Sequence, residues 1–301
     1  MSQYSDQYHM TAHGNSLAGK AAVITGASRG LGADIARALW RNRSNLLLVA
    51  RSQDGLIKLR EELIADAEDG QELHIVVADL MAADAVPAII REARQVWDRI
   101  DVLINNAAIL GPIGRVWEND WQEWQTTVRV NLLSSIELCR ACIPWMAERK
   151  YGKIINLSGG GATGPRPNFS AYATAKAGLI RFSETLAMEV RDLNIDVNCV
   201  APGMMNTAMT RAVLNAGPEK AGATEYTQAT SKSESARPDT HRAADLCVFL
   251  ASTASDGITG KLISAVWDPW ETLPDHIEDL KDADIYTLRR IVPKDRGQDW
   301  G

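Results

Sequence analysis

Short apolar runs alternate with longer amphipathic segments along most of the chain. Seven runs have the continuous hydrophobic character of buried strands, at 21–25, 45–50, 73–78, 101–106, 153–158, 195–201 and 261–265. The segments between them have helical periodicity. A strand covered on both faces gives a continuous apolar run, so this alternation indicates parallel βαβ units. We predict an α/β fold: a doubly wound, parallel, seven-stranded Rossmann sheet with helices on both faces.

The same pattern divides the chain into three parts. Residues 17–266 read as one Rossmann-type domain, because no internal repeat or interdomain linker interrupts them. The polar segment 1–16 is predicted to be a flexible N-terminal arm. Within the domain, the Ser- and Thr-rich stretch 224–239 is predicted to be a mobile loop. Residues 267–301 form an extension that we expect to pack on the same domain or on a neighbouring subunit, as a cover over the cleft at the carboxyl ends of the strands of either one. The alternative is that the extension only buries subunit surface.

Composition narrows the class of partner. The chain has 301 residues, 46% of them hydrophobic and 23% charged, as in an ordinary soluble globular protein. The formal net charge of −6 argues against a nucleic-acid partner. No apolar run approaches the ~18 residues that span a bilayer, and no signal peptide is evident. We expect a cytoplasmic protein with a small-molecule partner.

Four cysteines occur, at Cys139, Cys142, Cys199 and Cys247. The first two have a C-x-x-C spacing, for which a metal or redox site is one interpretation. No second Cys or His pair follows at ligand spacing, so reduced and buried thiols in a cytosolic protein are the preferred interpretation, with no metal.

A glycine-rich turn, T-G-A-S-R-G-L-G, follows the first predicted strand and opens the first predicted helix. Gly26, Gly30 and Gly32 permit a tight turn and a close approach of backbone N–H groups to a pyrophosphate at the positive end of the helix dipole. The alternative is a turn whose glycines serve packing alone.

A second candidate functional motif is the pair Tyr172 and Lys176, which lie one helical turn apart. A phenol titrates near pH ~10 and is a poor acid or base at neutral pH unless its pKa is lowered. Taken alone, the pair is better explained as an ordinary surface i,i+4 contact.

Together these motifs resemble the short-chain dehydrogenase/reductase family. The resemblance rests on the glycine spacing, on N-N-A-A at 105–108, and on Ser158, Tyr172 and Lys176 in the family's order, and it runs from about residue 17 to 265. Ala108 departs from the family's usual glycine, and we expect the turn to tolerate it. The T-G-x-x-G-x-x-G spacing of the sugar-nucleotide epimerase branch is absent.

The resemblance implies catalytic roles for four residues. Tyr172 corresponds to the family's proton donor, with its pKa lowered by Lys176 and by the oxidised nicotinamide ring. Bringing that pKa to about 7 takes roughly 3 units, or ~4 kcal/mol. Ser158 would hydrogen-bond the substrate oxygen. Asn131 resembles the residue that bends a helix and links the lysine to a water chain.

The resemblance also implies a dinucleotide site. Its expected residues are Gly26, Ser28, Arg29, Gly30, Leu31, Gly32, Arg51, Ser52, Asp79, Leu80, Asn106, Ala107, Tyr172, Lys176, Pro202, Gly203 and Thr207. Asp79 would accept from the adenine amino group, or else cap the following helix. Thr207 would reach the carboxamide.

Cofactor choice depends on the end of the second strand. NAD enzymes usually have an acidic residue there, whereas this chain has Arg51, with Arg29 in the glycine turn. Two arginines favour the 2′-phosphate of NADP(H), and NAD(H) remains the alternative.

The expected function is an NADP(H)-dependent interconversion of a secondary alcohol and a carbonyl. The alternatives are an NAD-dependent dehydrogenase and a non-catalytic nucleotide-binding scaffold. Arg115, Arg166 and Asn168 are candidates to line the pocket and would suit a polar substrate. The helices at 120–148 and 170–193 usually form subunit contacts in this family, which implies a homotetramer or homodimer.

Overall fold

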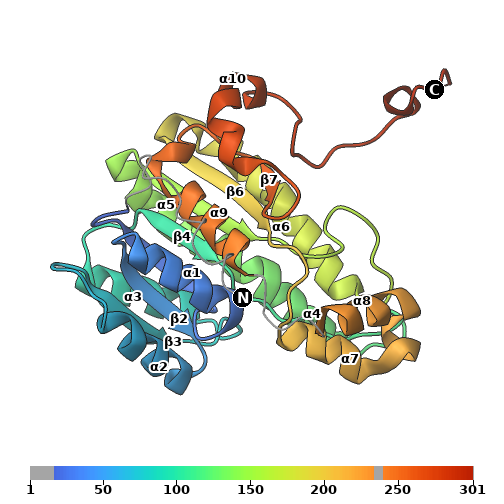
Figure 1. The fold of residues 1–301 in the computed structure, drawn as a ribbon, viewed down its shortest axis with the longest axis horizontal. Helices are drawn as coiled ribbons and strands as arrows, with labels where there is room; N and C mark the ends of the chain where they lie inside the picture. Colours follow the sequence, from blue (N-terminus) through green and yellow to red (C-terminus); the bar gives the residue numbers. More distant parts are fainter. Residues whose placement is uncertain (1–16, 234–239, 301) are drawn as a thin grey trace, which may run out of the picture.

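The computed structural model describes residues 17–233 and 240–300, and its centre is a parallel sheet (Figure 1). The N-terminal arm predicted at 1–16 lies outside the described residues. The sheet has seven strands in the order β3-β2-β1-β4-β5-β6-β7. This confirms the predicted doubly wound α/β fold. The strands are β1 (Ala21–Thr25), β2 (Asn45–Ala50), β3 (Leu73–Val77), β4 (Val102–Asn105), β5 (Gly152–Leu157), β6 (Ile195–Ala201) and β7 (Leu262–Ser264).

The central strands are buried on both faces, which explains their continuous apolar runs. In β1, Ile24 pairs with Leu48 of β2 on one side and with Ile104 of β4 on the other. All three side chains are fully buried. Burying an aliphatic side chain of this size contributes about 1.5–3 kcal/mol.

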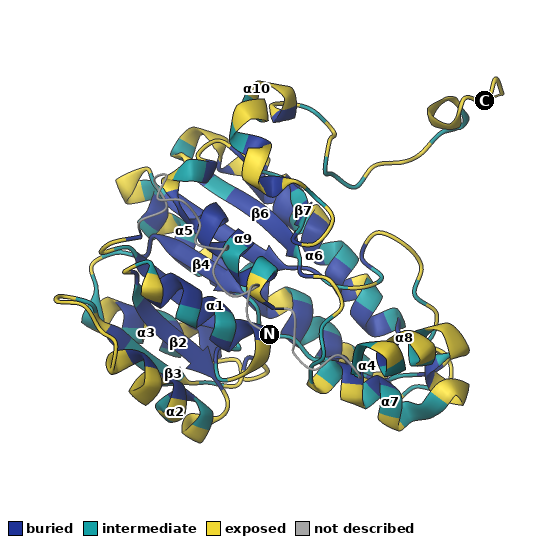
Figure 2. Ribbon diagram, in the orientation of Figure 1, coloured by how far each residue is buried: buried dark blue, intermediate teal, exposed yellow. Residues whose placement is uncertain are grey.

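Two layers of helices cover the sheet (Figure 2). One core cluster joins it to α1 (Gly30–Arg41), α2 (Gln53–Ile64) and α9 (His241–Ala251). The other joins it to α3 (Ala85–Val96), α5 (Ser134–Arg149) and α6 (Ser170–Glu189). Among residues 17–233 and 240–300, no helix has the length and apolar character needed to cross a bilayer.

The helix expected at 120–148 is interrupted at its centre. It consists of α4 (Trp121–Val128), a π-helical turn (Arg129–Leu133) and α5. Asn131 lies in the π-helical turn, where its side chain pairs with backbone outside the helix. The helix expected at 170–193 ends as α6 at Glu189, and a 3-10 turn (Arg191–Leu193) follows.

The loop prediction for 224–239 was wrong over the whole of its described part, 224–233. Residues Ala223–Ser233 form the helix α8, which packs on α7 (Ala208–Ala221) beside the end of the sheet (Figure 1). The small side chain of Ala229 is buried there. The Ser and Thr residues that suggested a loop lie on a helix stabilised by tertiary packing, which overrides their weak helix propensity. Residues 234–239 lie outside the described part.

The C-terminal extension packs against the domain up to about residue 288. A 3-10 segment (Trp270–His276) contacts α9, with the ring of Trp270 5.6 Å from that of Phe249, and the short α10 (Ile277–Leu280) follows it. The backbone N–H of Leu262 on the edge strand β7 donates to Tyr286 O at 2.7 Å. Beyond this point the chain leaves the domain as an extended arm (Figure 1).

Candidate active site

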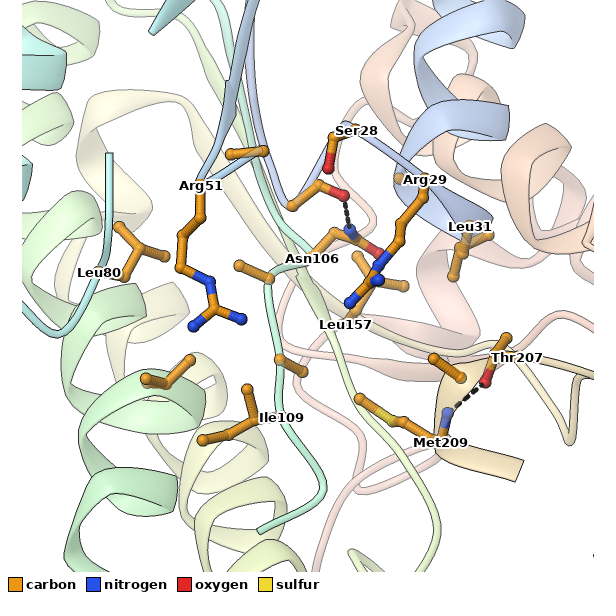
Figure 3. Close-up of a pocket in the computed structure, with 18 of the residues that line it drawn as sticks. Ser28, Arg29, Leu31, Arg51, Leu80, Asn106, Ile109, Leu157, Thr207 and Met209 are labelled. Atoms are coloured by element: carbon orange, nitrogen blue, oxygen red, sulfur yellow. Dashed lines mark hydrogen bonds between the residues drawn. The ribbon is translucent and has the colours of Figure 1, made fainter. Parts of the chain in front are cut away.

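A cavity of about 850 Å³ opens at the carboxyl ends of the strands. Figure 3 shows residues that line it. Of the residues predicted to form the site, the lining includes Gly26, Ser28, Arg29, Gly30, Leu31, Gly32, Arg51, Ser52, Asp79, Leu80, Asn106, Ala107, Ser158, Tyr172, Lys176, Pro202 and Thr207. Asn131 and Gly203 do not line it.

The glycine turn between β1 and α1 forms one wall of the cavity. A Cβ atom at Gly32 would lie 2.3 Å from Gly26 O, so only glycine permits this close packing of helix on turn. Asn106 Nδ2 donates to Thr25 O at 2.9 Å and to Gly26 O at 3.3 Å, which fixes the turn. The N-cap residue Arg29 makes no side-chain capping bond. The N–H groups at the start of α1 are therefore available to an anion.

Two arginines and an aspartate line the cavity: Arg29 is the N-cap of α1, Arg51 follows β2, and Asp79 comes shortly after β3. Figure 3 shows the guanidinium groups of Arg29 and Arg51 reaching into the cavity. Arg51 Nη1 lies 3.9 Å from Asp79 Oδ2. The other carboxylate oxygen of Asp79 accepts from Met81 N at 3.1 Å, so Asp79 caps a local turn rather than α3, whose N-cap is Asp84. This region is rich in hydrogen-bond donors suited to a phosphate.

Ser158, Tyr172 and Lys176 line the same cavity. Ser158 follows β5, and the other two project from the first turns of α6. Lys176 is 1% exposed, and its Nζ donates to Leu157 O at 2.6 Å. Burial lowers the pKa of Lys176 to about 8. An ammonium group buried at this cost beside a tyrosine and a serine is unusual outside a functional site.

The electrostatics of Tyr172 differ from the sequence-based expectation. Burial raises the pKa of the phenol above its ordinary value, and the positive charge of Arg166 opposes that effect. Lys176 Nζ lies 5.9 Å from the centroid of the tyrosine ring and is directed at Leu157 O. Any lowering of the Tyr172 pKa by Lys176 is therefore smaller than the increase that burial causes.

Gly159 keeps the hydroxyl of Tyr172 unobstructed. A Cβ atom at this position would lie 2.3 Å from Tyr172 Oη and 2.9 Å from the ring. No side chain fits in that space without displacing the ring. The small residues after β5 therefore have a steric role at the hydroxyl group.

Asn131 does not line the cavity but holds a residue that does. Its Nδ2 donates to Ile109 O at 2.8 Å and its Oδ1 accepts from Ile109 N at 2.9 Å, while Ile109 itself lines the cavity. The fully buried amide thus fixes the segment after β4. Its predicted link to Lys176 through water stays a prediction.

The segment after β6 was predicted only in part. Pro202 and Thr207 line the cavity, but Gly203 faces Val266, whose Cγ2 lies 2.7 Å from the position of a Cβ at Gly203. Thr207 is the N-cap of α7 and accepts from Met209 N at 3.3 Å (Figure 3). Residues not predicted from the sequence also line the cavity, among them Ile109, Met209 and Arg211. No motif marks them, because the fold alone brings them there.

The three polar candidates for the substrate pocket do not line this cavity. Arg166 forms a bidentate ion pair with Glu225 of α8. The guanidinium of Arg115 lies over the Trp117 ring, 5.5 Å from its centroid. The backbone carbonyl oxygen of Asn168 accepts a hydrogen bond from Gly114 N at 2.9 Å. The sequence did not reveal that the side chains of Arg115 and Arg166 have these partners.

All four cysteines are buried and free. Burial raises the pKa of Cys142 and of Cys199 to about 12. Within the described ranges, no cluster of three His, Cys, Asp or Glu side chains is placed to hold a metal.

Comparison with known proteins identifies the family. A family model described as short chain dehydrogenase matches residues 20–217. The chain belongs to the short-chain dehydrogenase/reductase family. Like its relatives, it is an NAD(P)-dependent oxidoreductase that acts on CH–OH donors.

Relatives of this dehydrogenase have diverse named substrates. The chain is 31% identical over 248 residues to a 3-oxoacyl-acyl-carrier-protein reductase of Chlamydia trachomatis, covering 82% of this chain and 96% of the relative. It is 38% identical over 212 residues to 3beta-hydroxysteroid dehydrogenase 1 of Eggerthella lenta, covering 69% and 79%. The structure of L-sorbose reductase from Gluconobacter frateurii with NADPH and L-sorbose is similar at a TM-score of 0.74 and 28% identity, covering 84% and 97%.

Proposed function

We propose that this dehydrogenase interconverts a secondary alcohol and a ketone or aldehyde of a small polar substrate, using NADP(H) and Tyr172 as the acid/base. One observation carries the proposal. The buried Lys176 lines the same cavity as Tyr172 and Ser158, and Arg29 and Arg51 line it too. This arrangement joins a proton-transfer group to a phosphate-binding region.

The residues present fit a dinucleotide. The side-chain-free surface of Gly26 and Gly32, together with the uncapped start of α1, suits a pyrophosphate. Asp79 and Arg51 would hold the adenosine end, and Thr207 and Lys176 the nicotinamide end. When bound, the cofactor supplies or accepts the hydride.

The chain's own residues would handle the proton and the substrate oxygen. In alcohol oxidation the deprotonated Oη of Tyr172 would accept the proton of the substrate hydroxyl as the carbon that bears this hydroxyl gives up its hydride. Ser158 donates a hydrogen bond to the substrate oxygen and holds it beside Tyr172. Lys176, anchored on Leu157 O, provides a positive charge that favours the phenolate. Carbonyl reduction reverses the proton movement.

The preference for NADP(H) is supported by charge. Arg29 and Arg51 both line the cavity, and no acidic residue occupies position 51. Charge-assisted hydrogen bonds contribute about 1.5–3 kcal/mol each, which favours a 2′-phosphate over a 2′-hydroxyl. The relative from Gluconobacter frateurii has NADPH bound. NAD(H) is the alternative, since Asp79 lies 3.9 Å from Arg51 and offsets part of its charge.

A polar substrate is supported by Asn206 and Arg211, which line the cavity with Ser158. Because the chain belongs to a family of enzymes, a non-catalytic scaffold role is not needed to explain this site.

We also propose a homodimer or homotetramer: Trp121 and Leu133 expose large apolar surface on the α4–α5 segment, where family members usually associate. Four free buried thiols support a reducing, cytoplasmic compartment.

The direct test mixes the purified protein with NADPH or NADH and a panel of ketones, ketoses and keto acids. Oxidation of the nicotinamide is followed by absorbance, and the products are identified. The proposal expects turnover of at least one polar carbonyl compound, with NADPH more efficient than NADH. Equal efficiency with both cofactors would contradict the NADP(H) assignment.

A further inference from the structure

An ion pair lies beside Tyr172, outside the catalytic residues described above. Arg166 is in the loop between β5 and α6, and Glu225 is in the first turn of α8. Arg166 Nε lies 2.9 Å from Glu225 Oε1, and Nη2 lies 2.7 Å from Oε2. The two side chains are 16% and 21% exposed, so the pair is mostly shielded from water.

The guanidinium group is held in place on two aromatic rings. It lies 4.0 Å from the ring centroid of the buried Phe169 and 5.8 Å from that of Tyr172. A bidentate carboxylate and a stacked aromatic ring together fix a planar guanidinium far better than a single exposed contact does. Arg166 is therefore a fixed positive charge beside the tyrosine ring.

Few other charges face Tyr172. Lys176 lies one turn further along α6, at 5.9 Å from the ring centroid. From α4, Trp124 contributes only a neutral hydrogen bond to Ser170, and from α7, Val213 contributes apolar packing. Arg211 of α7 lines the cavity. Glu225 reaches this region only through Arg166.

We propose that the Arg166–Glu225 pair is a positioning device that sets the proton affinity of Tyr172 and ties α8 to the loop carrying Gly159. The proposal rests on the proposed acid/base role of Tyr172. Arg166 stabilises the phenolate by its charge, and Glu225 both holds Arg166 in place and offsets part of that charge. The direction is consistent with the effect of Arg166 on the pKa of Tyr172, which opposes that of burial.

Neutralising either partner, in Arg166→Gln or in Glu225→Gln, should move the pKa of Tyr172 in opposite directions. This outcome distinguishes the proposed role from a purely structural one. Arg166→Gln removes the cation, so the phenol should titrate at a higher pH. Glu225→Gln leaves the cation uncompensated, so the phenol should titrate at a lower pH. Each shift should be on the order of one pH unit, a tenfold change in proton affinity, for a charge at this separation. Loss of a merely structural contact would move both variants in the same direction.

The measurement uses the full chain with ¹³C-labelled tyrosine and saturating oxidised cofactor. The Tyr172 resonance is assigned by its loss in Tyr172→Phe and then titrated by NMR in the wild type and in each variant. Arg166→Lys keeps the positive charge and should titrate close to the wild type. If Arg166→Gln does not fold, Glu225→Gln and Arg166→Lys still decide the matter. Shifts in the same direction, or no shift with Glu225→Gln, would overturn the proposal.

Kinetics separate this proposal from the role of Tyr172 itself. The pH at which alcohol oxidation reaches half its maximum should move in the same directions as the NMR titration. If Tyr172→Phe retains activity, the acid/base role is wrong, whereas the NMR shifts report the effect of the ion pair independently.

Discussion

At the scale of single residues, the site depends on a glycine that has no side chain as well as on a buried lysine side chain. Gly159 leaves room for the hydroxyl of Tyr172, and a methyl group there would lie 2.3 Å from Oη. Lys176 has its charge buried in the protein interior, with one carbonyl oxygen as its hydrogen-bond acceptor. The first feature excludes any larger residue at position 159, and the second lowers the stability of the fold, as residues at functional sites often do.

Gly159→Ala should displace the Tyr172 ring and lower kcat by at least about tenfold, because misplacing a reacting group by roughly 1 Å costs that much or more. Gly164→Ala is the matched control: it lies in the same loop, and no atom lies within 4 Å of the added Cβ. Steady-state kinetics of both variants test the prediction. Equal activities would show that the ring adjusts without loss.

Lys176 should make the free energy of unfolding depend on pH. Its pKa is about 8 in the folded protein and near 10.5 when unfolded. Between these values the unfolded chain binds a proton that the folded chain does not, so stability rises with pH across this window, by roughly 3 kcal/mol in all. Urea unfolding of Lys176→Met should lack this rise. A constant stability difference between variant and wild type from pH 7.5 to 10 would contradict the prediction.

At the scale of elements, the carboxyl ends of β2 and β3 bring Arg51 and Asp79 together beside the start of α1. Arg51→Asp replaces a cationic hydrogen-bond donor to the 2′-phosphate by a negative charge that repels this phosphate. The kcat/KM with NADPH should therefore fall about 10- to 100-fold relative to that with NADH. Arg60→Asp, on the exposed side of α2, is the control for net charge. If both variants change the cofactor ratio equally, the effect is not local to the site.

The sequence predicts the elements that carry local signals and misses those that depend on tertiary contacts. The β1–α1 turn and the Tyr172–Lys176 pair were predictable, because each combines a motif with a clear strand or helix pattern. A bend at Asn131 was expected only from the family resemblance, and the two hydrogen bonds that its side chain makes to Ile109 join segments that are distant in sequence. Helix α8 depends on packing against α7 and on the ion pair with Arg166. Such contacts leave no periodic trace in the sequence.

At the scale of the whole molecule, the C-terminal extension has two parts with different roles. Trp270, Leu273 and Leu280 belong to the same core cluster as α9. Leu288 N donates to Glu184 Oε1 at 2.6 Å on α6, well along the helix from Tyr172. None of the described residues of the extension lines the cavity of its own chain, so the prediction of a cover over its own cleft was wrong. Contact with a neighbouring subunit stays a prediction.

Two truncations separate these parts. Ending the chain after Leu288 removes only the extended arm with its exposed Ile291 and Trp300, and should leave the monomer's stability nearly unchanged. If the arm contacts a neighbouring subunit, the oligomer should become smaller in size-exclusion chromatography or KM should rise. Ending it after Ala265 removes three buried side chains worth about 1.5–3 kcal/mol each and should destabilise the fold itself. Unchanged assembly and KM after the first truncation would rule out a subunit-bridging arm.

The central claim is proton transfer by Tyr172, and Tyr172→Phe tests it most directly. With a carbonyl substrate from the panel, single-turnover reduction should slow by about 10²-fold or more, because the proton donor is lost. NADPH binding, measured by fluorescence titration, should remain within about twofold of wild type, since the ring and its packing are kept. A variant that binds NADPH normally and retains more than a tenth of the wild-type rate would contradict the account.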